Sequence, residues 1–232
     1  MDKKILTREV NLKDHLNSIE DNMIADNGLD TRIPIKGSVR IYNNITGELL
    51  RAKDNLVVYA SREIIIPRIF NKDRTSGEIK RNYSINWISV GTGGASVADP
   101  YTPLMVKSTD ESLVNEIVLS SGNPDYVDGG KKKPILWDEK EILADELNDN
   151  RYLICKTTTL IGRDEANGVS GNHINEAALW WSPSPYTTDG NTGFNPANAG
   201  DPNNFVMASR FTFPTLYKTD AMEFLIVWFY FV

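Results

Sequence analysis

Residues 224–232 form an uninterrupted apolar run, FLIVWFYFV, and this run limits the folds open to the chain more than any other feature. A membrane-spanning helix needs roughly 20 apolar residues, so the run is too short to be one. In a strand, successive side chains point to opposite faces, so both faces of this segment would be apolar. We therefore expect residues 222–232 to form an interior strand of the main sheet.

Alternating apolar and polar residues predict further strands. One strand is predicted by apolar residues at odd positions: Ile33, Ile35, Val39 and Ile41. A second, over residues 83–90, would have Tyr83, Ile85 and Trp87 on one face and Ile88 and Val90 on the other. Residues 152–159 alternate in the same way. Since strands do not alternate with helices, we expect a mainly β fold, an antiparallel, jelly-roll-like β-sandwich with long loops.

The chain divides into an N-terminal arm, residues 1–30, and a sandwich domain, residues 31–232. Four apolar residues of the arm recur at helical spacing: Leu12, Leu16, Ile19 and Met23. This helical or extended arm either packs on its own domain or docks on a neighbouring subunit. Within the sandwich we expect a short helix over residues 60–70. We also expect two excursions, one charged at about 121–150 and one turn-rich at about 182–204.

Charge and composition exclude several classes of protein. The net charge of −6 argues against nucleic-acid and anionic-membrane partners, which favour clustered Lys and Arg. The single cysteine excludes an internal disulfide and a Cys-rich zinc site, and there are two histidines. The first residues lack the apolar run of a signal peptide. We therefore expect a protein made in a reducing cytosol and kept there, or assembled from there into a larger particle.

The glycine-rich residues 91–94 follow a predicted strand, as phosphate-binding loops do. The Lys-Ser/Thr pair of a P-loop is missing, however, and two prolines follow where a helix should begin. We therefore interpret these residues as a tight turn in which glycine supplies positive φ angles.

Two groups of residues are candidate metal ligands. His173 and Glu176 are three residues apart, which suits one helical face, but no third ligand stands beside them, so a hydrogen-bonding role is expected. The second group consists of the loop residues Asp189, Asn191, Asn195 and Asp201. These lack the alternation of a calcium-binding loop, so a solvated loop is expected. The sequence predicts no metal and no cofactor.

No catalytic constellation stands out in the sequence. The G-x-S-x-G motif of a nucleophilic serine is absent, and Cys155 lies in a strand-like segment where a buried, inert thiol is expected. The acidic pairs at 138–139 and 145–146 fall in a charged segment that we interpret as solvated. We therefore expect no catalytic residue and no enzymatic activity.

Three blocks of the chain resemble a group of small tailed-phage virion proteins. The first is TGELLRAKDNLVVYASREII at residues 46–65, and the second is WISVGTGGASVADPYTPL at residues 87–104. The third joins INEAALWW to the segment from residue 207 to 231, and its matching positions are Ile174, Glu176, Ala178, Leu179, Trp180, Arg210, Phe213, Pro214, Lys218 and Trp228. Ala178 replaces the usual glycine, and residues 113–116 stand in place of a Leu-x-x-E-x-x-R motif.

The resemblance implies a structural role in the virion, in several copies in the tail, baseplate or neck, with possible anchoring of fibres. The implied partners are other phage virion proteins and further copies of the chain. A capsid decoration protein is one alternative. Another is a module on a fibre that binds a host surface glycan through a polar and aromatic surface: Trp180, Trp181, Tyr186, Asp189 and Asn191. Burial of both tryptophans in the core is the competing interpretation.

Overall fold

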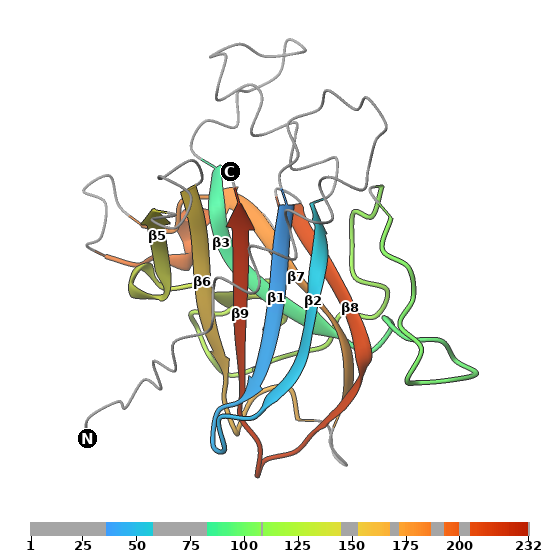
Figure 1. Ribbon diagram of the computed structural model, residues 1–232. Helices are drawn as coiled ribbons and strands as arrows, with labels where there is room; N and C mark the ends of the chain where they lie inside the picture. The colour runs from blue at the N-terminus through green and yellow to red at the C-terminus, as the bar shows by residue number, and fades with distance from the viewer. Residues whose placement is uncertain are drawn as a thin grey trace, which may run out of the picture.

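The computed structural model describes residues 36–57, 83–107, 109–144, 153–167, 172–186, 193–199 and 205–231. These residues form nine strands, all paired antiparallel, with two short 3-10 turns, η1 (Trp137–Glu139) and η3 (Pro196–Ala199). Two sheets pack together as a β-sandwich (Figure 1), which confirms the predicted fold class.

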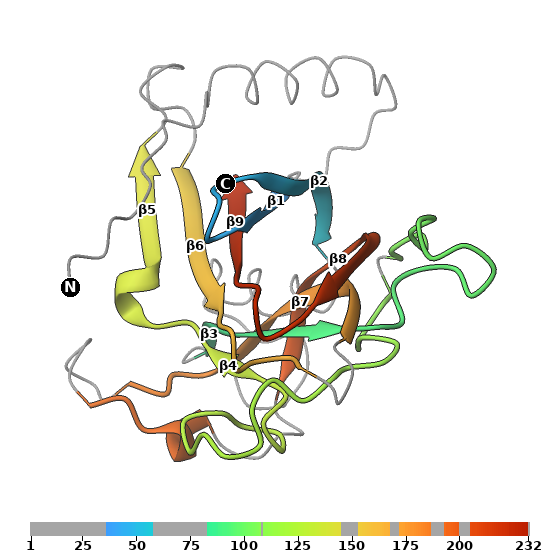
Figure 2. The same ribbon diagram turned by 90° about the horizontal axis from the view of Figure 1, so that it is seen from below.

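The two sheets are continuous through one shared strand. The first sheet contains β1 (Lys36–Asn43), β2 (Leu49–Val57), β5 (Lys140–Ala144), β6 (Leu153–Ile161) and β9 (Phe224–Phe231), in the order β2-β1-β9-β6-β5. The second contains β3 (Tyr83–Gly91), β4 (Lys133–Pro134), β7 (Asn172–Pro183) and β8 (Val206–Lys218), in the order β4-β3-β7-β8-β2. Residues 49–55 of β2 pair with β1, and Leu56 and Val57 pair with β8. Figure 2 shows β2 at the corner between the sheets.

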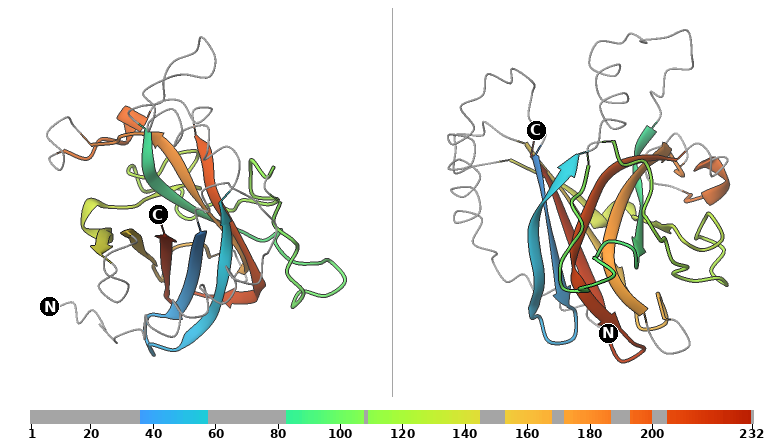
Figure 3. Two further views of the ribbon diagram at one scale, coloured as in Figure 1. Left: turned by 45° about the horizontal axis from the view of Figure 1, so that its top comes forward. Right: turned by 90° about the vertical axis from the view of Figure 1, so that its right-hand side faces the viewer.

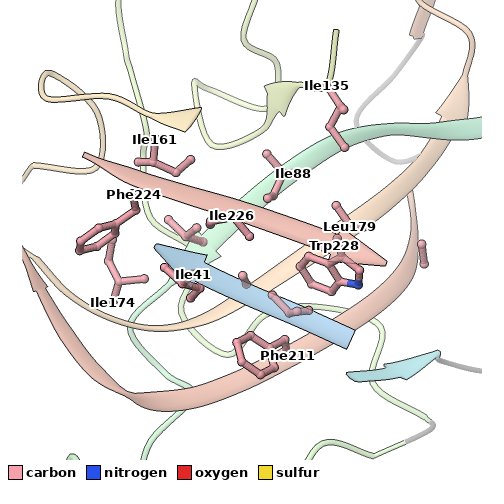
Figure 4. Close-up of a cluster of buried hydrophobic side chains, with 14 of the residues drawn as sticks. Ile41, Ile88, Ile135, Ile161, Ile174, Leu179, Phe211, Phe224, Ile226 and Trp228 are labelled. Atoms are coloured by element: carbon pink, nitrogen blue, oxygen red, sulfur yellow. The ribbon is translucent and has the colours of Figure 1, made fainter. Parts of the chain in front are cut away.

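The main hydrophobic core lies between the two sheets. Trp228 of β9 meets Phe211 of β8 edge to face, with ring centroids 6.4 Å apart. Around this pair, Ile41 of the first sheet and Ile88 and Leu179 of the second are almost fully buried (Figure 4). Burial of each such side chain contributes roughly 1.5–3 kcal/mol, so this layer holds the two sheets together.

The C-terminal apolar run forms an interior strand, as predicted. β9 pairs with β1 along one edge and with β6 along the other. Ile226 and Trp228 face the main core. Val227 and Phe229, on the opposite face, are only 7% and 5% exposed. From Ile226 to Tyr230, both faces of β9 are therefore buried.

β3 departs from the predicted alternation. The pairing of β3 with β7 shifts register between Ile85 and Trp87, where Asn86 is the extra residue. Tyr83 and Ile88 consequently face the main core, whereas Trp87 belongs to a second cluster on the opposite face of the sheet. The prediction that Tyr83, Ile85 and Trp87 share one face is therefore wrong.

The outer face of the second sheet carries this second hydrophobic cluster. Its buried members are Trp87, Leu113, Ala178, Trp180 and Met207. Leu113 belongs to the connection between β3 and β4, so this connection covers part of the outer face. The indole N–H of Trp180 donates to Ser89 Oγ at 2.8 Å, which satisfies the polar atom of a buried ring.

Residues 130–135 are packed on the sandwich, whereas residues 121–125 are exposed, so the predicted excursion at 121–150 is only partly correct for the residues that the structure describes. Residues 121–144 contain β4, which pairs with β3, and β5, which extends the first sheet beyond β6. Ile135 is fully buried, and Lys132 is only 4% exposed. A buried lysine stem contributes apolar contact area, so a segment with few apolar residues can still pack on the core.

Several predictions lie outside the described residues. These are the N-terminal arm of residues 1–30 with Leu12, Leu16, Ile19 and Met23, the helix over residues 60–70, the strand positions Ile33 and Ile35, and two parts of the loop at 182–204, residues 187–192 and 200–204, with Asp189, Asn191 and Asp201. In the ranges that the structure does describe, there is no helix long and apolar enough to cross a membrane.

Candidate functional site

The most prominent surface feature is a loop of residues 94–107 that projects from the sandwich after β3 (Figure 1 and Figure 3, left). Four large apolar side chains of this 94–107 loop are exposed to solvent: Val97, Tyr101, Leu104 and Met105. The exposed fractions of Tyr101 and Met105 are 71% and 85%, and Val97 is fully exposed. Several large apolar side chains exposed on one loop favour a protein-binding surface.

The 94–107 loop is ordered by its own hydrogen bonds. The carboxylate of Asp99 accepts a hydrogen bond from the Thr102 hydroxyl at 2.6 Å and another from the Tyr101 N–H at 2.9 Å. These bonds lower the pKa of Asp99. The Ser96 N–H donates to the Thr102 carbonyl at 2.9 Å, which closes the loop. The exposed apolar side chains therefore project from a fixed backbone.

Threonines of β8 attach the loop to the outer face of the second sheet. The hydroxyl of Thr212 donates to the Leu104 carbonyl at 2.6 Å. Thr215 donates to the Pro100 carbonyl from its hydroxyl at 2.7 Å and from its N–H at 3.1 Å. The N–H of Leu104 donates to the Gly94 carbonyl at 2.8 Å, so the two ends of the loop are joined.

Glu176 lies beneath the loop and has no solvent-exposed surface. Its Oε1 accepts hydrogen bonds from the N–H groups of Gly93 and Asn115, both at 3.0 Å. Its Oε2 accepts from the Val114 N–H at 3.2 Å and from Arg210 Nη2 at 2.7 Å. One carboxylate thus links β7, β8 and two separate parts of the connection between β3 and β4.

Arg210 completes this buried network. Its second terminal nitrogen, Nη1, donates to Asp110 Oδ2 at 2.7 Å, and the same oxygen accepts from the Lys107 N–H at 3.0 Å. Asn175 Oδ1 accepts from the Gly94 N–H at 2.6 Å. A carboxylate that is buried and bonded on both oxygens cannot reach a substrate, so the network holds the loop in place and offers no general acid or base.

The glycines of residues 91–94 are needed because neighbouring atoms leave no room for a Cβ, and not because their φ angles are positive. A Cβ at Gly94 would lie 2.3 Å from the Asn175 carbonyl oxygen, and a Cβ at Gly91 would lie 2.6 Å from the Asn115 carbonyl oxygen. None of these glycines is among the residues with positive φ. The turn is structural, as expected, but the reason that we expected for its glycines is wrong.

A buried lysine, Lys132, fixes the part of the β3–β4 connection that contains Glu116 and Asp128. Lys132 Nζ donates to both carboxylate oxygens of Glu116, at 2.9 and 3.0 Å, and to Asp128 Oδ2 at 2.6 Å. The same ammonium lies 4.3 Å from the ring centroid of Trp180, within reach of a cation–π interaction. Lys132 therefore links the connection to the second hydrophobic cluster.

Of the aromatic residues predicted to form a binding surface, the two tryptophans are buried. Trp180 and Trp181 are 4% and 8% exposed and belong to the two hydrophobic clusters, because β7 is an interior strand of its sheet. Neither tryptophan can therefore stack on a ligand, and this part of the prediction is corrected. Tyr186 is half-buried, next to the exposed Trp137, which the sequence analysis did not single out.

His173 and Glu176 do not form a metal site. They lie in a strand, not on one face of a helix, and the Glu176 carboxylate is occupied by Arg210 and backbone N–H groups. The exposed His173 ring lies 5.1 Å from the ring of Tyr217. Among the described residues, no group of three His, Cys, Asp or Glu side chains could hold a metal ion.

Cys155 is half-buried against the main core, and burial raises the pKa of its thiol. A raised pKa lowers the fraction of reactive thiolate. The thiol is less buried than predicted, and its inertness stays a prediction. Of the acidic pair at 138–139, Glu139 accepts a hydrogen bond from the Leu136 N–H at 2.9 Å.

The sequence did not predict the contacts that join Glu176, Arg210 and Asp110. Glu176 and Arg210 were singled out as motif positions, but nothing local indicates that they meet across β7 and β8. The exposed loop had a weak signal, since Val97, Tyr101 and Met105 stand in a segment rich in turn formers. Comparison with models of known protein families, with curated proteins and with solved structures finds no match to this chain.

Proposed function

We propose that the chain is a structural subunit of a tailed-phage virion that assembles in several copies in the tail, baseplate or neck. The observation that carries this proposal is the ordered 94–107 loop with its exposed Val97, Tyr101 and Met105. Apolar side chains on a fixed backbone lose little conformational freedom on docking, so this loop suits a permanent contact. The resemblance of the three sequence blocks supplies the link to phage particles.

The partner of the loop in this proposal is a neighbouring copy of the chain. The buried network supports a contact between copies, because a loop that joins subunits permanently must keep one conformation. Arg210 and Glu176 fix its base, and Thr212 and Thr215 fix its side. None of these contacts requires a substrate or a cofactor.

The contact is tested with the double variant Val97→Asp/Met105→Asp. Two buried charges at the contact should dissociate the assembly, because an unpaired charge is strongly disfavoured in an apolar interface. Sedimentation velocity should show oligomers for the unaltered chain and monomers for the variant, with the same circular dichroism spectrum. Ile142→Asp, at a 76% exposed apolar residue of β5, is the matched control and should still assemble.

Location in the particle is tested by mass spectrometry of purified virions. The proposal expects the chain in several copies per particle. A chain found only in the soluble fraction of the infected cell, or a double variant that assembles as well as Ile142→Asp, contradicts the proposal.

A further inference from the structure

The chain has five tryptophans, and only one of them is at the surface. Trp87, Trp180, Trp181 and Trp228 are at most 8% exposed, whereas Trp137 is 53% exposed. Trp137 begins η1, directly after β4, next to Leu136, which is 43% exposed. An exposed indole is uncommon on a soluble protein and presents a large flat apolar face.

A series of aromatic contacts holds this indole in place. The Trp137 ring meets the Tyr186 ring edge to face, with centroids 6.4 Å apart. Tyr186 packs on Phe194 at 5.6 Å, and Phe194 packs on the buried Trp87 at 6.1 Å. The Tyr186 hydroxyl also donates to the Ile135 carbonyl at 3.4 Å. A continuous series of ring contacts thus connects the exposed Trp137 to the buried Trp87 and restricts its motion.

Polar groups surround the braced ring. Lys140 Nζ lies 5.8 Å from the centroid of Tyr186 and donates to the buried Asn86 Oδ1 at 2.8 Å. Asp138, the next residue after Trp137, is exposed. Tyr186 and Phe194 also pair as a β-bridge, which holds Tyr186 in position.

We propose that Trp137 and Tyr186 form a binding platform for a sugar ring of a neutral polysaccharide. A pyranose has a face of C–H groups that packs on an aromatic ring, and hydroxyl groups at its rim that need polar partners. The platform offers both, and its bracing lowers the entropy lost on binding. This site goes beyond the structural role proposed above and does not depend on it.

The two carboxylates beside Trp137 outnumber the one ammonium at Tyr186, which favours uncharged over acidic sugars. Asp138 and Glu139 adjoin Trp137 in the chain, and their carboxylates repel an acidic sugar while they can accept hydrogen bonds from hydroxyls. We therefore expect neutral polysaccharides to bind and polygalacturonate, which carries a carboxylate on each sugar, to bind far more weakly.

The experiment uses the full chain and measures retardation in native gels that contain dextran, mannan, galactomannan, laminarin or polygalacturonate. At least one neutral polysaccharide should retard the protein. Trp137→Ala should weaken this binding about tenfold, the effect expected for loss of one aromatic contact. Trp137→Phe should retain part of it, because a smaller ring remains. Circular dichroism checks that each variant is folded.

Tryptophan fluorescence gives a second readout that is specific to the site. Acrylamide quenches exposed indoles, so the quenchable part of the emission should come from Trp137 and be lost in Trp137→Phe. The bound polysaccharide should protect the unaltered chain from acrylamide.

Tyr101→Ala, at an exposed aromatic of the 94–107 loop, is the matched control. It should leave sugar binding unchanged while it weakens assembly, so failure of one proposal is distinguishable from failure of the other. The platform is refuted if no neutral polysaccharide binds, if Trp137→Ala binds as well as the unaltered chain, or if polygalacturonate binds best.

Discussion

At the scale of single residues, the network around Glu176 is the feature on which most of the loop structure depends. Its carboxylate accepts four hydrogen bonds, three from backbone N–H groups and one from Arg210. Glu176→Gln replaces one acceptor oxygen by a donor and removes the fully buried carboxylate from Arg210, which keeps only its pair with Asp110. We expect a loss of about 3–5 kcal/mol in the free energy of unfolding, measured by urea denaturation.

Glu141→Gln is the control for this prediction. Glu141 pairs with Lys156 at 3.1 Å, but its side chain is 48% exposed. An exposed pair contributes about 0–1 kcal/mol, so its loss should hardly shift the urea midpoint. Equal midpoints for Glu176→Gln and Glu141→Gln would show that the buried network does not stabilise the fold.

Gly94 permits the close contact between the turn and β7. Gly94→Ala would place a methyl group 2.3 Å from the Asn175 carbonyl oxygen, a backbone atom that cannot rotate away. Forced backbone shifts of this kind cost about 1–3 kcal/mol, measured here as a loss of thermal stability. Gly122→Ala, where no atom lies within 4 Å of the added Cβ, should change stability little. Similar losses for both variants would contradict the steric argument.

Lys140 makes stability depend on pH in the alkaline range. Burial lowers its pKa from 10.5 to about 8, although Glu139 opposes the shift. Between these two values the unfolded chain binds more protons than the folded one, so stability should rise as pH increases. From about pH 7.5 to pH 9.5 one such lysine adds about 1–2 kcal/mol. Urea midpoints at both pH values measure the gain.

Lys140→Met should reduce this gain to the net contribution of the other shifted groups. Burial lowers the pKa of Lys133 to about 8 and also lowers that of Lys218, whereas the raised pKa of Cys155 acts in the opposite direction. Lys53→Met, at an exposed position of β2, should leave the gain unchanged. The comparison stops below pH 10, because burial raises the pKa of Tyr230 and its titration destabilises the fold at higher pH. An identical pH dependence for Lys140→Met and the unaltered chain would contradict the assignment.

At the scale of elements, the sequence predicted strands wherever one face alternates regularly or where both faces are apolar. Val39 and Ile41 lie in the core as predicted, and β9 is interior. β3 was mispredicted in part because the extra residue Asn86 resets the alternation, and single-sequence patterns carry no signal for such a bulge.

β4 and β5 were missed for a different reason. They lie in a charged segment whose burial depends on long-range partners of its lysines. Lys132 pairs with Glu116 and Asp128, and Lys133 pairs with Glu165 at 2.8 Å. Pairing allows charged residues to be buried. Asp128 is a local partner, but Glu116 and Glu165 come from other segments of the chain, so hydrophobic periodicity cannot reveal these pairs. The same holds for Glu176 and Arg210 in the candidate site.

The position of β9 predicts the effect of removing it. Deletion of residues 222–232 takes out a strand paired along both edges, together with Trp228 and Phe224 of the main core. Because each large side chain contributes roughly 1.5–3 kcal/mol, the loss exceeds the ~5–15 kcal/mol stability of a typical domain. Expression should give an insoluble or unfolded product by circular dichroism. A soluble, β-rich product would contradict the interior role of β9.

At the scale of the whole molecule, the described strands pair without any residue of the predicted N-terminal arm. The nine strands of the described residues lie within 36–231, so the pairing of β1 with β2 and β9 does not require the first 29 residues. The arm predicted from Leu12, Leu16, Ile19 and Met23 lies outside the described residues and stays a prediction.

Deletion of residues 1–29 should therefore leave a folded, β-rich chain that assembles poorly, because a narrow apolar stripe suits a partner surface better than a core. Circular dichroism should match that of the full chain, and sedimentation velocity should show smaller species at equal protein concentration. The Val97→Asp/Met105→Asp variant provides the comparison, since it should also be folded and dissociated. An unfolded deletion product would place the arm in the core, and a fully assembled one would leave the 94–107 loop as the contact without any need for the arm.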